Sequence, residues 1–157
     1  MSRKVSLMFL EASIVFFGVG CVWGTIMTFP SVHSFLESAP ARIIVGMHSH
    51  WNLLGWVSLA LIGVIYYLVP AIVGKELYSE KLARIHFWLF VLLIIITSTL
   101  GTVAGYQGGM LFSAKRFTEI EATMGPYMIM LNVLYIIEAL VPVSLFAYNI
   151  RKTITRK

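Results

Sequence analysis

The amino-acid sequence predicts an all-α integral membrane protein, with four transmembrane helices in an antiparallel bundle. Only 12% of its 157 residues are charged and 59% are hydrophobic, whereas a soluble domain carries about 25% charged residues. The mean hydropathy is +0.85. A bilayer requires about 20 apolar residues per helix. Within a single domain, residues 1–157, apolar runs of this order occupy about 7–29, 42–74, 85–106 and 126–150.

The first run, residues 7–29, is expected to be a membrane span that the mature protein retains. It is too long for the apolar region of a signal peptide and has no small-residue cleavage site. Gly20 and Gly24 form a small-xxx-small pair, which lets another helix approach closely. Cys21 is the single cysteine, so it cannot form an internal disulfide and is expected to be a packing residue. Glu11, one turn inside the span, is expected to reach the interface.

The remaining spans differ in length and in their connections. The second run, residues 42–74, exceeds what a bilayer requires, so it is either tilted or begins outside the hydrocarbon. A short polar link separates it from the third run, residues 85–106. We expect a longer loop over residues 107–125. Pro126 then suits the first turn of the fourth span, and Pro142 is expected to kink that helix.

The positive charges orient these spans. The net charge is +5, and the cations sit at span ends, which makes nucleic-acid binding unexpected. One side carries Arg3, Lys4, Lys75, Lys81, Arg84, Arg151, Lys152, Arg156 and Lys157. The other side carries only Arg42, Lys115 and Arg116. By the positive-inside rule the sequence predicts a multi-pass protein of the cytoplasmic membrane with both termini in the cytoplasm.

Two histidines, His48 and His50, open the second span and are the first candidate ligands. Residues two apart on a helix point about 200° away from each other, so a single metal cannot take both. If the backbone is irregular here, an extended His-x-His could chelate copper or zinc with help from Met47 or His33. Both rings could also simply hydrogen-bond at headgroup depth. The residues alone leave haem, another metal and a structural role open.

Two further ionisable residues, His86 and Glu138, lie elsewhere in the spans. About 23 residues, or about 35 Å, separate His50 from the end of its helix, and His86 begins the returning helix from that far end. His50 and His86 therefore cannot ligate one iron within one subunit, and we expect His86 at the inner interface. Glu138 lies about halfway down the fourth span. It is a proton-path candidate, or else a protonated carboxyl that packs against another helix.

These motifs resemble the haem-copper oxidase and nitric oxide reductase large-subunit superfamily. His-Trp-Asn-Leu-Leu at residues 50–54 and Tyr-Tyr-Leu-Val-Pro at residues 66–70 are similar to the bounds of the second helix of the nitric oxide reductase large subunit. The third span resembles the eleventh helix of cbb-type oxidases and the fourth span their twelfth; the first span has no such motif. The chain thus resembles helices one, two, eleven and twelve, which form one of the family's three arcs of four.

The resemblance implies a cofactor and a ligand. The family histidine at this position ligates the low-spin haem b, and alignment on Asn52 selects His50 rather than His48. The implied function is a membrane cytochrome b toward the outer face, for electron transfer (from quinol, for example) or gas binding. The helices that carry the copper ligands have no counterpart among the four, so we do not expect haem-copper oxidase activity from this chain alone. Arg42, Lys115 and Arg116 are the expected partners of the haem propionates.

In the family the second axial histidine belongs to the tenth helix, which has no counterpart here either. Three solutions follow from the resemblance. A neighbouring copy in a homo-oligomer, a dimer or a trimer, could supply the ligand, with His48 as the residue that crosses the interface. The iron could instead be five-coordinate, or a partner protein could ligate it. Alternatives to haem b are an outer copper or zinc site at His33, His48 and His50, and a cofactor-free accessory or assembly subunit of a respiratory oxidase.

Overall fold

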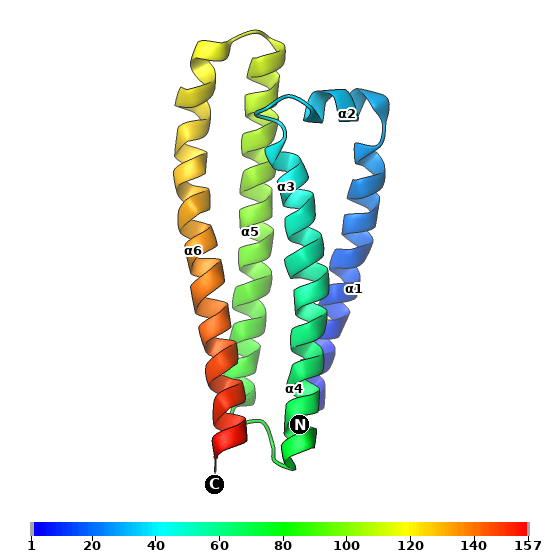
Figure 1. Ribbon diagram of the computed structural model, residues 1–157, viewed down its shortest axis with the longest axis vertical. Helices are drawn as coiled ribbons and strands as arrows, with labels where there is room; N and C mark the ends of the chain where they lie inside the picture. The colour runs from blue at the N-terminus through cyan, green and yellow to red at the C-terminus, as the bar shows by residue number, and fades with distance from the viewer. Residues whose placement is uncertain (1, 157) are drawn as a thin grey trace.

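Four long apolar helices run side by side in the computed structural model, which describes residues 2–156 (Figure 1). The second of them is continuous from Ile43 to Val73 but contains a π-helical segment. This architecture confirms the predicted fold class. The elements are α1 (Ser2–Met27), α2 (Pro30–Leu36), α3 (Ile43–His50), the π-helix η1 (Trp51–Ser58), α4 (Leu59–Val73), α5 (Glu80–Ser113) and α6 (Phe117–Thr155).

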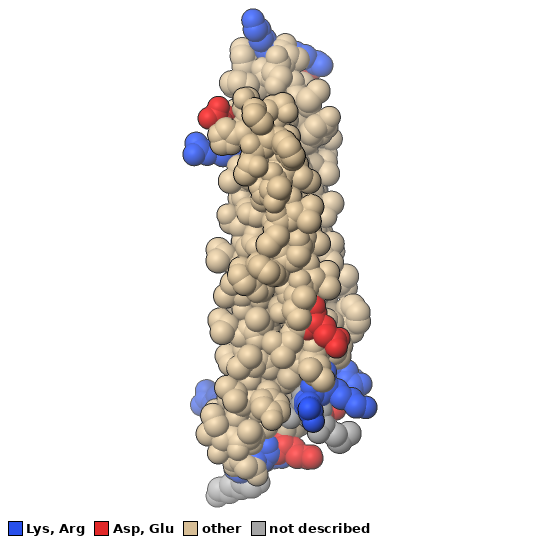
Figure 2. All heavy atoms as spheres, turned by 90° about the vertical axis from the view of Figure 1, so that its right-hand side faces the viewer, with Lys and Arg blue, Asp and Glu red and all other residues tan. Residues whose placement is uncertain are grey.

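Neighbouring spans are antiparallel, and the two termini lie at the same end of the bundle (Figure 1). The short α2 crosses the opposite end, where α5 also turns into α6. In sequence order, α1 packs along η1 and α4, α3 packs against α5, and α5 packs along α6. Most charged side chains gather at the two ends and leave a broad uncharged band between them (Figure 2). This distribution is the one that a helix bundle needs in order to cross a bilayer.

Gly20 and Gly24 on α1 allow the close approach predicted from their spacing. A Cβ added to Gly20 would lie 2.6 Å from Asn52 Oδ1, and one added to Gly24 would lie 3.1 Å from His48 Cε1. Both glycines therefore face the start of the second span. Their role in helix packing brings α1 against the histidine motif.

A second set of glycines, on α5, was not predicted from the sequence. A Cβ on Gly101 would lie 2.3 Å from Met47 Sδ, and one on Gly105 would lie 2.2 Å from Ile43 Cγ2. Both are real clashes, since carbon atoms in contact stay about 3.5–4.0 Å apart. The bare backbone of α5 thus forms the surface on which α3 rests, and this contact positions the helix that ends at His50.

The connection between α4 and α5 has clear local causes. Gly74, with a φ of 63°, ends α4 in the left-handed conformation that glycine adopts without a steric penalty. Ser79 begins α5 as its N-cap, and its Oγ accepts a hydrogen bond from Leu82 N at 3.1 Å. Asn149 on α6 clamps this turn: its Nδ2 donates to Ser79 O at 2.9 Å, and its Oδ1 accepts from Ser79 N at 3.1 Å.

Asn149→Ala is expected to lower the free energy of unfolding by about 1–3 kcal/mol, because it removes both partners of the Ser79 backbone. Asn149 is fully buried, so water does not readily replace the lost bonds. Thermal unfolding in detergent measures the effect. Asn132→Ala is the matched control, since Asn132 is exposed on the same helix. Equal stability of the two variants would contradict the clamp.

The prediction of a loop over residues 107–125 is wrong. α5 continues to Ser113 and α6 already begins at Phe117. Gly108 and Gly109 look like loop residues in the sequence, but they pack closely under the chain before α3: a Cβ on Gly109 would lie 2.8 Å from Ala41 Cβ. Tertiary packing therefore overrides their low helix propensity. Pro126, expected at a first turn, lies inside α6.

His86 is also placed differently from the expectation of an interfacial residue. It is 1% exposed, and its ring stacks on Phe90 with centroids 5.9 Å apart. Tyr66 Oη lies 3.0 Å from His86 Nδ1. The aromatic core in the half of the bundle near the termini is thus built around a hydrogen-bonded histidine, and the hydrogen bond satisfies one of the two ring nitrogens.

Candidate functional site

The structure brings His50 and Glu138 together. His50 Nε2 lies 3.2 Å from Glu138 Oε1 and 3.1 Å from Oε2. The side chains are 12% and 4% exposed, respectively. His50 is the last residue of α3, and Glu138 lies near the middle of α6. His50 and Glu138, both singled out in the sequence, therefore form one pair between the second and fourth spans.

This pair lines a cavity of about 650 Å³ between the second span and α6. On the second span, lining positions recur every four residues at His50, Leu54 and Ser58, so one helix face forms that wall. Phe90 lines it from α5. The full lining is His50, Leu54, Ser58, Leu61, Ile62, Phe90, Tyr135, Glu138, Ala139, Val143 and Phe146. The cavity is thus mostly apolar, and its polar side chains are His50, Ser58, Tyr135 and Glu138.

A π-helix begins directly after His50 and was not predicted from the sequence. In this segment, Trp51–Ser58, Ser58 Oγ donates to Leu53 O, five residues earlier, at 2.8 Å. Gly55 makes room for Phe16 of α1: a Cβ there would lie 2.4 Å from Phe16 Cδ1. Single π-helical turns inside α-helices are frequent at functional sites. In the sequence, the only hint of this π-helix was Gly55, which lies between Trp51 and Trp56. A glycine there is equally consistent with close helix packing, so it does not predict a π-helix.

His48 lies on another face of the same helix. Its ring contacts Gly24 of α1, and Asn52 Nδ2 lies 3.4 Å from either ring nitrogen. Asn52 Nδ2 also donates to His48 O at 2.9 Å. The two histidines thus contact different helices, α1 and α6, as helical geometry predicts. The extended His-x-His alternative is wrong, because both residues belong to the α-helix Ile43–His50.

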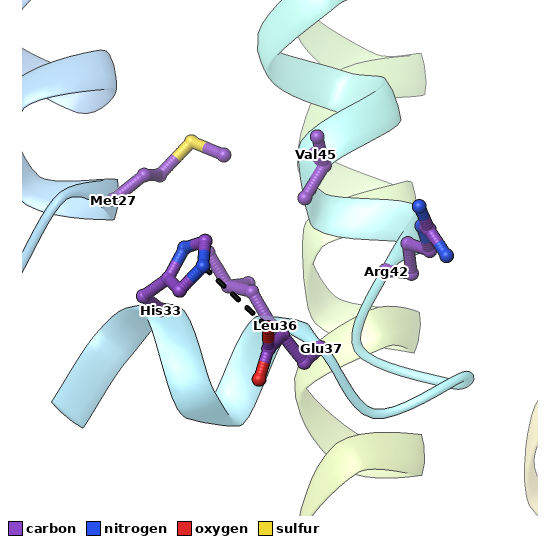
Figure 3. Close-up of a pocket in the computed structure, with 6 residues that line it drawn as sticks. All are labelled: Met27, His33, Leu36, Glu37, Arg42 and Val45. Atoms are coloured by element: carbon purple, nitrogen blue, oxygen red, sulfur yellow. Dashed lines mark ion pairs between the residues drawn. The ribbon is translucent and has the colours of Figure 1, made fainter. Parts of the chain in front are cut away.

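A shared metal site for His33, His48 and His50 does not form either. Within residues 2–156, no three His, Cys, Asp or Glu side chains converge as a metal ion would require. Instead, Nε2 of His33 lies 3.6 Å from Oε1 of Glu37, the residue that caps the C-terminal end of the same short helix. Figure 3 shows this pair facing one another across the end of α2.

Arg42, Lys115 and Arg116, the expected propionate partners, do not line the His50 cavity. Arg42 borders a separate pocket of about 430 Å³, together with His33 and Glu37 (Figure 3). Arg116 forms an ion pair with Glu119, with Nε 2.6 Å from Oε1, and Lys115 occupies the turn beside it. Lys115 and Arg116 lie far from the cavity because α5 and α6 extend beyond the predicted spans. Along α6, Arg116 is about 33 Å from Glu138 at 1.5 Å per residue.

Comparison with known proteins identifies the relatives of this chain. The family model for cytochrome c and quinol oxidase polypeptide I matches residues 1–140. A cytochrome c oxidase subunit 1 homolog of Agrobacterium tumefaciens is 30% identical over 154 residues, covering 90% of this chain and 27% of the relative. The cbb3-type cytochrome c oxidase subunit CcoN1 of Stutzerimonas stutzeri is 31% identical over 109 residues, covering 69% of this chain and 22% of the relative.

A shorter match joins the chain to the heme-copper oxidase subunit I+III of Aeropyrum pernix, 46% identical over 50 residues, which are 32% of this chain and 6% of the relative. The chain spans about a quarter of the length of the Agrobacterium relative, 27%. The family match covers most of the chain, including the helices that carry both His50 and Glu138. On this ground, the chain belongs to the cytochrome c and quinol oxidase polypeptide I family.

Proposed function

We propose that this chain is a membrane cytochrome b that holds haem b in the cavity between the second span and α6, with His50 as an axial ligand. The observation that carries the proposal is the position of His50 Nε2 at a large apolar cavity. Histidine is a common axial ligand of haem iron. The Aeropyrum relative, which is named as a heme-copper oxidase subunit, supports the same cofactor class.

The residues of the cavity fit a haem. Its volume of about 650 Å³ falls in the range of about 300–1,000 Å³ typical of cofactor sites. Its walls are mainly aliphatic and aromatic, which suits a largely apolar macrocycle. Glu138 Oε2 is buried and has no hydrogen-bond partner among the described residues, although it lies near Nε2. An unsatisfied buried oxygen at the proposed ligand position supports a functional role for this place over ordinary packing.

Each part of the site has a distinct task in this proposal. A bound haem would supply one-electron redox chemistry. His50 would ligate it, while Leu54, Phe90 and Phe146 would pack against the macrocycle and exclude water. The second span and α6 provide these residues from rigid helices, which holds a cofactor in a defined position. Glu138 is a proton-path candidate beside it, and quinol is a suitable donor because it dissolves in the bilayer.

We propose that the sixth ligand of the iron comes from another protein molecule or is absent. Because His48 packs against α1 of its own chain, its use by a neighbouring copy would require this ring to leave Gly24 and Asn52. A five-coordinate iron needs no such rearrangement and would leave a position open for gas. A homo-oligomer, dimer or trimer, remains our proposal for the six-coordinate form.

We also propose that the termini face the cytoplasm. The end of the bundle that holds them carries most of the lysine and arginine residues, and the positive-inside rule places such an end in the cytoplasm. A topology reporter fused to the C-terminus checks the orientation.

The function is tested on protein purified from haem-sufficient cells. We expect Soret and alpha bands typical of reduced haem b. Carbon monoxide should shift the Soret band if the iron is five-coordinate and leave it unchanged if a second residue ligates it. A colourless protein that co-purifies with a larger oxidase would contradict the proposal and support a cofactor-free accessory or assembly subunit instead.

A further inference from the structure

We propose that Glu138 competes with haem iron for Nε2 of His50, so that the carboxylate limits how tightly this chain binds haem. The inference rests on the proposed function and adds a residue that sets cofactor affinity. The inference is based on the two carboxylate oxygens of Glu138, which lie 3.2 Å and 3.1 Å from Nε2 of His50.

One nitrogen cannot serve both partners. Iron takes the lone pair of a neutral imidazole nitrogen. At this distance an ionised Glu138 accepts a hydrogen bond from Nε2–H, whereas a protonated Glu138 donates a hydrogen bond to the Nε2 lone pair. In each case Nε2 is engaged, and a metal ion approaching along the same direction must displace Glu138. The contact and the ligation are therefore mutually exclusive.

The surroundings strengthen the contact that must be broken. Glu138 is 4% exposed, so little water is available to replace the imidazole. No lysine or arginine lines this cavity among the described residues, and the hydrogen bond of the Glu138 carboxylate there is to His50 Nε2. Hydrogen bonds to a charged group contribute about 1.5–3 kcal/mol, which converts to about tenfold or more in affinity.

Tyr135 gives the displaced carboxyl a place to go. It lines the same cavity one helical turn before Glu138, and its ring centroid lies 5.8 Å from that of His50. Residues three apart on a helix are neighbours on one face. Ligation therefore moves Glu138 within the cavity and does not expel it into lipid.

The test is a haemin titration of protein expressed without haem and purified in detergent. Glu138→Leu, which removes the competing oxygens, is expected to bind haem about tenfold tighter or more than the unchanged protein. Glu138→Gln keeps a neutral hydrogen bond of roughly half the strength and should gain about threefold. Glu11→Leu is the matched control, because it removes an exposed carboxylate on α1 away from the cavity, and it should leave the affinity unchanged.

Two failures are distinguishable. If the unchanged protein binds haem through His50 and Glu138→Leu binds it equally or more weakly, the competition is overturned while the proposed function stands. If neither protein binds haem, the proposed function itself fails and takes this inference with it. Should Glu138→Leu not fold, Glu138→Gln decides, since it preserves the shape of the side chain: tighter binding supports competition, and equal or weaker binding overturns it.

Discussion

Replacing His50 with alanine is expected to reduce the haem content of the purified protein by more than about tenfold. Even outer-shell partners of a metal ligand are worth about 10–100-fold in metal affinity, and His50 would be a direct ligand. The apolar walls of the cavity remain in this variant, so any residual haem reports hydrophobic retention alone. The ratio of haem to protein after pyridine extraction measures the loss.

His33→Ala is the control for this variant. His33 is exposed on α2 and does not line the His50 cavity, so its replacement should leave the haem content unchanged. Free imidazole added to His50→Ala is expected to restore part of the spectrum, because the deletion leaves room for the missing ring. Full haem content in His50→Ala would assign the ligand to another residue.

Gly105→Leu is expected to lower the stability of the bundle, because the new side chain has no space between α5 and α3. A side chain at this position would meet Ile43 and Ile44, including Ile44 N of the backbone at 3.3 Å from the added Cβ. Backbone cannot rotate away, so α3 must move off α5. Overpacking of this kind costs about 1–3 kcal/mol. Because α3 ends at His50, haem affinity should fall with stability.

Gly18→Leu is the matched control on α1, since no heavy atom lies within 4 Å of an added Cβ there. Unfolding in sodium dodecyl sulfate, followed by circular dichroism, compares the two variants. We expect the midpoint of Gly105→Leu alone to fall. If both variants keep the original midpoint, the α3–α5 contact does not position the second span as the structure indicates.

The four spans were predictable because bilayer crossing imposes a constraint that acts locally along the chain. The opposed faces of His48 and His50 were predictable for a similar reason, since two residues on one helix share a fixed geometry. Gly20 and Gly24 belong to the same class: their spacing alone places them on one face. Each of these predictions depends only on neighbours within a few turns.

The features that were missed depend on distant contacts. Residues 107–113 carry glycines that favour a loop locally, yet packing against the chain before α3 keeps them helical. The His50–Glu138 pair joins residues 88 apart in sequence, so its formation depends on the relative height of two spans. The same heights separate Arg116 from the cavity. Hydrophobic periodicity carries no information about such registers between helices.

The most direct test of haem ligation by His50 is the position of iron in crystals of the purified protein, located by anomalous X-ray scattering at the iron absorption edge. We predict a single strong peak in the cavity between the second span and α6, at coordination distance from His50 Nε2. We also expect the Glu138 carboxylate to have moved away from that nitrogen. A peak beside another residue, or no iron in protein grown with ample haem, would contradict haem ligation by His50.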